Sequence, residues 1–129
     1  MPVKFATVDF YQAMADQLNN DPAWVKIGKD LSYSMVHVYT DPVDRRFYSA
    51  FDSGKVTGVR EATEADAEAA DFVIAAPPDV WRGIFDKTMD PTAALTAGKI
   101  QVQGDMTTLL KDMQAFLYVV EAMTKVPFS

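Results

Sequence analysis

The side chains that most often carry catalysis are scarce in this chain. His37 is the only histidine, and there is no cysteine. Thiolate nucleophiles, disulfides, thiolate metal sites and the paired histidines of an H-E-x-x-H zinc site are therefore excluded. The glycine-rich nucleotide-binding patterns and the G-x-S-x-G nucleophile pattern are also absent from the sequence. We therefore predict no catalytic residue, no metal and no cofactor.

His37 is the one side chain that could act as a general base. It belongs to a stretch with period-two alternation, in which Met35 and Tyr39 fall on the same face. A general base needs a positioned partner, and the sequence indicates none. We therefore interpret His37 as a hydrogen-bonded structural residue of a strand and leave it out of the predicted site. A small enzyme that uses His37 with an Asp or Tyr partner stays open as an alternative.

The seven methionines are a second chemical feature of the sequence. Four of them, Met14, Met106, Met113 and Met123, fall on the apolar faces of the two longest predicted helices. Methionine is flexible and polarizable, so it suits ligands of variable apolar shape, but it is equally typical of a packed core. The methionines therefore leave a ligand pocket and an ordinary core both open.

Length and charge limit the classes of partner. With 129 residues, 49% hydrophobic residues and no repeat or linker, we expect a single domain over residues 1–129. The net charge of −6 and the lack of a basic cluster larger than Arg45-Arg46 argue against nucleic acid. The N-terminus lacks the pattern of a secretory signal, so we expect a soluble, cytoplasmic protein without integral membrane contact. Monomer and homodimer stay open.

Hydrophobic periodicity predicts an α+β domain. Two helices come first, at residues 8–18 and 23–28, followed by three strands in an antiparallel meander at residues 32–40, 45–53 and 55–60. The acidic segment 61–71 is expected to form a solvated helical turn or loop. Beyond it we predict a strand at residues 72–76, a helix at 79–87, a short helix after Asp90-Pro91, a strand at 100–103 and a last helix at 106–125.

The last helix carries the longest apolar stripe of the chain. The stripe predicts one continuous helix with one solvated flank and one flank that faces a core or a ligand. Its members are Met106, Leu109, Leu110, Met113, Phe116, Leu117, Val120 and Met123.

The segment from Asp90 to Met106 resembles the signature of the sterol carrier protein type 2 family. Members of that family show D/N-P, a small residue, and then G-K/R-I/L-x-V/I-x-G-D/N before an amphipathic C-terminal helix. The matching positions are Asp90, Pro91, Ala94, Gly98, Lys99, Ile100, Val102, Gly104 and Asp105. The resemblance covers residues 70–124, and residues 1–60 agree with the family only in the order of their elements.

The resemblance implies a five-stranded, mainly antiparallel sheet covered by helices, with an apolar tunnel that carries fatty acyl chains, sterols or similar lipids without chemistry. The signature residues themselves are interpreted as folding devices. Pro91 starts a helix, Gly98 and Gly104 allow positive φ, and Asp105 caps the last helix.

The resulting hypothesis is a non-catalytic carrier of lipid or other hydrophobic ligands. In it, sheet and helix residues face one another across the cavity, and bulky aromatic residues narrow it. The predicted lining consists of Phe10, Met14, Met35, Phe47, Phe51, Trp81, Phe85, Met106, Leu110, Met113 and Leu117. The alternative is an accessory subunit that has kept the fold, filled the cavity, and binds an enzyme acting on hydrophobic substrates.

Overall fold

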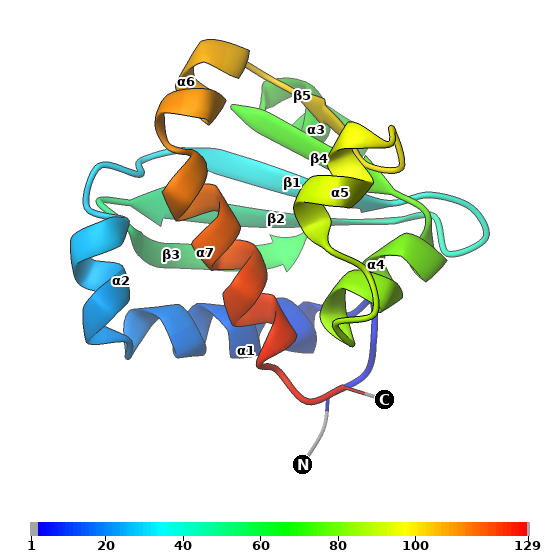
Figure 1. Ribbon diagram of the computed structural model, residues 1–129, viewed down its shortest axis with the longest axis horizontal. Helices are drawn as coiled ribbons and strands as arrows, with labels where there is room; N and C mark the ends of the chain where they lie inside the picture. Colours follow the sequence, from blue (N-terminus) through cyan, green and yellow to red (C-terminus); the bar gives the residue numbers. More distant parts are fainter. Residues whose placement is uncertain (1–2, 129) are drawn as a thin grey trace.

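The computed structural model describes residues 3–128, which form a five-stranded sheet with helices on both sides (Figure 1). The chain runs through α1 (Val8–Asn19), α2 (Pro22–Ile27), β1 (Ser34–Tyr39), β2 (Arg45–Asp52), β3 (Lys55–Glu61), α3 (Glu64–Ala69), β4 (Phe72–Ala76), α4 (Pro78–Phe85), α5 (Pro91–Thr96), β5 (Gln101–Gln103), α6 (Met106–Lys111) and α7 (Met113–Thr124). The predicted α+β class and all five predicted strands are confirmed.

The sheet is mixed and mainly antiparallel. Its strand order is β3-β2-β1-β4-β5, and only the central pair β1 and β4 runs parallel. The antiparallel meander of β1, β2 and β3 is as predicted. The segment between β3 and β4 crosses one face of the sheet through α3, which places β4 beside β1 rather than beside β3.

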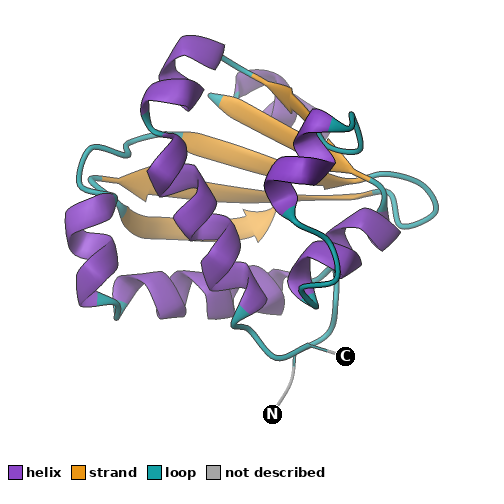
Figure 2. Ribbon diagram, in the orientation of Figure 1, coloured by secondary structure: helices purple, strands orange, loops and turns teal. Residues whose placement is uncertain are grey.

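The core lies between one face of this sheet and most of the helices. In Figure 2, α5, α6 and α7 lie in front of the sheet and α1 runs along the β3 edge, while α3 lies behind. Alternate residues of β1 and β2 point to the front and are buried, namely Met35, His37, Tyr39, Phe47, Ser49 and Phe51. The front face of the sheet therefore holds both the core and any pocket.

Local signals place the helix ends. Asp21, Asp90 and Asp105 each accept a hydrogen bond from a backbone N–H in the first turn of the helix that follows. Gly98 has φ +77° and Gly104 has φ +142°, as the folding-device interpretation requires. A Cβ at Gly104 would lie 2.5 Å from a ring carbon of Phe72, so the turn after β5 also needs glycine for space.

The prediction of one continuous C-terminal helix is wrong. Helix α6 ends at Lys111 and α7 begins at Met113, with Asp112 at φ −102° and ψ 20° between them. The Asp112 carboxylate accepts a hydrogen bond of 3.3 Å from the Tyr33 hydroxyl. This contact is 79 residues distant in sequence, and the apolar stripe continues across the break, so periodicity could not reveal it.

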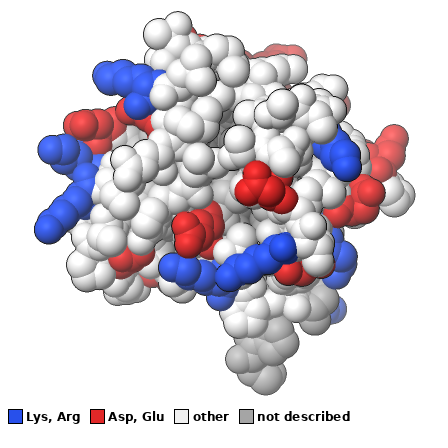
Figure 3. Space-filling model, viewed as in Figure 1, with Lys and Arg blue, Asp and Glu red and all other residues white. Residues whose placement is uncertain are grey.

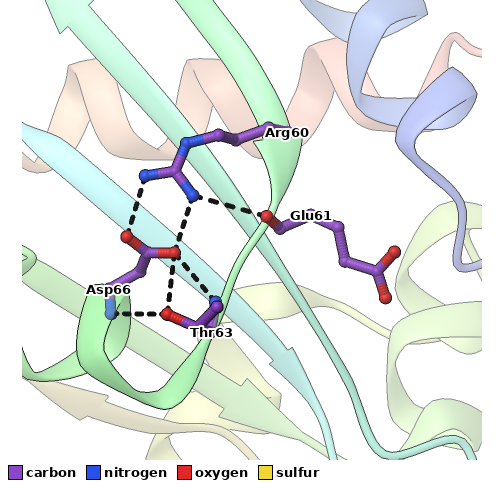
Figure 4. A network of polar contacts seen from close by, with 4 residues as sticks. All are labelled: Arg60, Glu61, Thr63 and Asp66. Carbon is purple, nitrogen blue, oxygen red and sulfur yellow. Dashed lines mark hydrogen bonds and ion pairs between the residues drawn. The ribbon is translucent and has the colours of Figure 1, made fainter.

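The acidic segment contains the short helix α3, which buries none of its residues. Figure 4 shows what holds it at the end of β3: the Arg60 guanidinium makes two hydrogen bonds to Asp66, of 2.6 and 2.8 Å. Asp66 also completes a capping box with Thr63. These contacts, with Arg60 contributing most, lower the pKa of Asp66. The predicted solvated helical turn is confirmed, and one of its acidic residues, Asp66, caps the helix.

Candidate functional site

An apolar pocket lies between the β4–β5 side of the sheet and the C-terminal helices. Its floor is formed by Met35, His37, Ile74 and Val102 from β1, β4 and β5. Its walls come from α5, α6, α7 and the residue before β5, namely Pro91, Leu95, Ile100, Leu109, Met113, Phe116, Leu117, Val119 and Val120. The pocket has a volume of about 70 Å³.

Strand register places the floor residues in one row across the sheet. His37 lies opposite Ile74 in the parallel pair, and Ile74 lies opposite Val102 in the antiparallel pair. Side chains at matched register positions point to the same face, so these three line the pocket together. The parallel placement of β4 beside β1 is therefore what brings the signature strand β5 within reach of His37.

His37 is the only polar side chain that lines the pocket. It is 1% exposed, and within residues 3–128 its Nδ1 has no hydrogen-bond partner. The rings of Tyr11 and Trp81 lie beside it, with centroids at 5.3 and 5.7 Å. Burial lowers the pKa of His37 to about 4, so the imidazole is neutral at pH 7.

The expectation that His37 is hydrogen-bonded is therefore wrong at Nδ1. The polar groups of three side chains near it bond other residues. The Tyr11 and Tyr39 hydroxyls hydrogen-bond each other at 2.8 Å. The Trp81 Nε1 donates to the Val38 carbonyl at 2.9 Å. The polar groups of Tyr11, Tyr39 and Trp81 thus each take part in a hydrogen bond with another residue.

An open groove lies outside the pocket, between residues 87–92 and α7, with a volume of about 500 Å³. Pro91, Leu117 and Val120 line both the groove and the pocket, so only these side chains separate the two. Charged residues occur at the groove and not in the pocket. Figure 3 shows this face, where uncharged side chains cover much of α6 and α7 and a few acidic side chains lie near the centre.

Three residues of the predicted lining, Met35, Met113 and Leu117, are brought together in this pocket. Six others are buried in the core away from it, namely Phe10, Met14, Phe47, Phe51, Trp81 and Phe85. Phe10, Phe47, Trp81 and Phe85 belong to one aromatic cluster, in which the Phe10 and Phe85 rings lie 4.6 Å apart. Phe51 packs on Trp24 instead. Aromatic side chains fill the space in which the hypothesis placed a ligand.

The last two predicted residues, Met106 and Leu110, face outward. They are 46% and 66% exposed, because α6 turns away from α7 at Asp112 and buries only Leu109. Of the lining that sequence reasoning missed, Ile100 and Val102 had a signal, since they are the apolar positions of the signature. The sequence holds no signal that separates pocket from core for the other missed residues Ile74, Leu95, Val119 and His37.

Residues 3–128 support neither a metal site nor a membrane-spanning helix. No three His, Asp or Glu side chains lie together there as a metal site would need. A membrane crossing would require a helix longer and more apolar than any in that part of the chain.

Comparison with known proteins gives one family match. A model described as the SCP-2 sterol transfer family matches residues 29–117, which is more than half of the chain. A search of curated protein sequences finds no significant match.

Solved structures with the same fold include three of nearly the same length. A Thermus thermophilus protein described as possibly a sterol carrier protein is 22% identical, with a TM-score of 0.81 over 98% of this chain and 92% of its own. A sterol carrier protein 2 is 23% identical, with a TM-score of 0.79 over 92% and 95%. The ubiquinone synthesis protein UbiJ-SCP2 is 19% identical, with a TM-score of 0.60 over 87% and 90%.

Proposed function

The chain belongs to the SCP-2 sterol transfer family, and from this premise we propose that it binds and carries lipid or other hydrophobic small molecules, without chemistry, in the pocket between the sheet and α5–α7. The observation that supports the proposal is the lining itself: twelve of the thirteen residues are apolar. A pocket of this character suits an apolar ligand with few polar groups. A cytoplasmic location is part of the proposal.

The pocket must enlarge to take a ligand of lipid size. Sites for drug-sized ligands are typically about 300–1,000 Å³, several times the volume of this pocket. The outer groove can supply space once Leu117 and Val120 move, and Met113 can change rotamer at little cost. We therefore propose that the ligand enters from the groove and occupies both spaces.

Titration of a fluorescent fatty acyl probe tests this proposal. Burying about 300 Å² of apolar ligand surface supplies roughly 7 kcal/mol before association costs, so we expect affinity that is micromolar at best. Val120→Trp fills the boundary between groove and pocket and should weaken probe binding about ten-fold or more. Val25→Trp is the matched control, because Val25 is exposed on α2 and lines neither space. An unmodified protein that binds no probe would contradict the proposal.

A second candidate is an accessory subunit that binds an enzyme acting on hydrophobic substrates. It is favoured by the small pocket and by the exposed Met106 and Leu110, which give α6 an apolar outer surface. The fold is shared with a ubiquinone synthesis protein as well as with sterol carriers. Native mass spectrometry distinguishes the two: a carrier retains or takes up lipid, whereas a filled accessory subunit does neither.

A further inference from the structure

We infer that His37 makes the pocket select ligands with an uncharged hydroxyl, such as long-chain alcohols, over ionised fatty acids and over plain hydrocarbons. The inference rests on the proposed function, and it assigns to that site a specificity-determining residue. It follows from the position of His37, from the state of its neighbours and from the absence of charge in the lining.

The His37 side chain lies at the floor of the pocket. The imidazole stands in the row with Ile74 and Val102, under the walls formed by α5 and α7. All other lining residues are apolar, so His37 is the only side chain there that can hydrogen-bond a ligand. A pocket made for hydrocarbon alone needs no imidazole.

No neighbour within residues 3–128 forms a hydrogen bond with the His37 Nδ1. The Tyr11 and Tyr39 hydroxyls bond each other and the Trp81 Nε1 donates to the Val38 carbonyl, so neither of these bonds is made to His37. An unpaired polar atom in a nearly fully buried side chain destabilises the free protein, and a ligand hydroxyl that pairs with it removes that penalty. A hydroxyl can donate to an imidazole nitrogen or accept from an imidazole N–H, so it suits either tautomer.

An ionised carboxylate is a poor ligand for the same floor. No Lys or Arg lines the pocket, and the imidazole is neutral because burial disfavours its charged form. A carboxylate brought to the floor would lose its hydration without gaining a counter-charge. Lys87 lies at the outer groove, where a carboxylate would have to remain.

Ser49 provides a competing explanation for the unpaired Nδ1. Its Oγ is the second buried polar side-chain atom without a hydrogen-bond partner within residues 3–128, and it does not line the pocket. In the antiparallel pair of β1 and β2, Ser49 lies opposite Met35, one diagonal step from His37. A buried water that joins Ser49 to His37 would satisfy both groups and leave none for a ligand.

Calorimetric or displacement titrations with three probes of matched size test the inference. 1-Decanol and undecane differ only by hydroxyl against methyl, and decanoate is ionised at pH 7.5. The unmodified protein should prefer decanol to undecane by about 3- to 10-fold, and it should also prefer decanol to decanoate. His37→Leu should abolish the preference for decanol over undecane, while His37→Gln, which keeps a donor and an acceptor, should retain part of it. Leu95→Met is the control that alters the wall without changing its polarity.

The readout is a ratio of affinities within one variant, so a general change in stability does not produce it. The inference is overturned if His37→Leu keeps the preference for decanol, or if the unmodified protein binds decanoate as tightly as decanol. Loss of the preference in Ser49→Ala as complete as in His37→Leu would assign the hydrogen bond to a shared water and overturn direct contact. Failure of all three probes and of the fluorescent acyl probe would overturn the proposed function as well.

Discussion

Several buried polar side chains of this protein have a single hydrogen-bond partner or none within residues 3–128. The clearest pair is Tyr11 and Tyr39, whose hydroxyls are buried and bond only each other. Burial raises the pKa of both hydroxyls, so both are protonated at pH 7. The pair connects α1 to the central strand β1.

Removal of one of these hydroxyls should cost more than removal of both. Tyr39→Phe leaves the Tyr11 hydroxyl buried and unpaired, which should destabilise the protein by about 1–3 kcal/mol. The double variant, with Tyr11→Phe and Tyr39→Phe, removes both polar groups and should recover most of that loss. Urea denaturation of the two single variants and the double variant measures the coupling. Additive losses would contradict the description of an isolated buried pair.

His37 should make the folded state less stable in mild acid. Its pKa is about 4 when folded against 6.5 as the ordinary value, so the unfolded chain binds a proton first as the pH falls. The stability is fully present above pH 6.5 and is lost as the pH falls toward 4, by about 3 kcal/mol in total. Asp21, Asp66 and Asp86 have lowered pKa values, so their contribution is lost only at lower pH.

The measurement is the free energy of unfolding between about pH 7.5 and pH 4.5, the range in which histidine titrates. Because His37 is the only histidine, His37→Leu should remove most of the slope in this range. The variant should also be at least as stable as the unmodified protein at about pH 5, since it no longer buries an unpaired nitrogen. An unchanged slope in the variant would place the acid sensitivity in another group.

At the scale of elements, α6 and α7 behave as separate units although one apolar stripe runs through both. Helix α6 depends on its cap, in which the Asp105 carboxylate accepts hydrogen bonds from the Thr107 and Thr108 backbone N–H groups. Helix α7 depends on burial, and it contributes five residues to the pocket wall. Substitutions in α6 and in α7 should therefore differ in their effects on stability and on ligand preference.

Met113→Ala tests whether the start of α7 is core or pocket wall. At a pocket wall the side chain already lacks partners on one side, so its loss should cost less than the roughly 2–5 kcal/mol typical of a core methionine. The main effect should be a shift in preference toward longer or bulkier ligands. Melting curves and lipid competition measure the two effects. Strong destabilisation with unchanged chain-length preference would remove Met113 from the site.

Asp105→Ala is the companion variant for α6. Loss of the cap should cost about 0.5–2 kcal/mol and leave the ligand preference unchanged, because Asp105 does not line the pocket. A changed ligand preference in this variant would show that α6 shapes the bound ligand directly.

The whole molecule divides into a filled half and an adaptable half. The aromatic cluster of α1, α4 and the central strands has rings in contact, as in the Tyr11–Phe47 pair at 4.9 Å, and such packing resists change. The half around β5, α5, α6 and α7 holds the pocket, and α6 buries only Leu109 there. Enlargement of the pocket should therefore be confined to the second half.

Hydrogen exchange with and without a saturating ligand tests this division. Amides of α5, α6, α7 and β5 should exchange faster in the free protein and gain protection on binding. Amides of β2 and α1 should change little, because no residue of β2 or α1 lines the pocket. A uniform gain of protection across the sheet would indicate global stabilisation without local opening.

The sequence by itself determined most of the elements and their order, but not the division of the last helix into α6 and α7. Strand alternation, the aspartate and proline caps, and the glycines of the signature act over a few residues, so β1 to β5 and the starts of α2, α5 and α6 follow from local chemistry. The resemblance of residues 90–106 to one family predicted the sheet and its helical cover.

Only the tertiary structure decided which apolar residues face a pocket and which fill a core. Phe47 and Met35 have the same pattern in sequence, yet Tyr11 packs on Phe47 whereas Met35 borders the pocket. At the helix break the Asp112 carboxylate accepts a hydrogen bond from Tyr33, and Tyr11, whose ring lies beside His37, bonds Tyr39. Each outcome is set by contacts between residues far apart in the chain, and periodicity carries no information about such contacts.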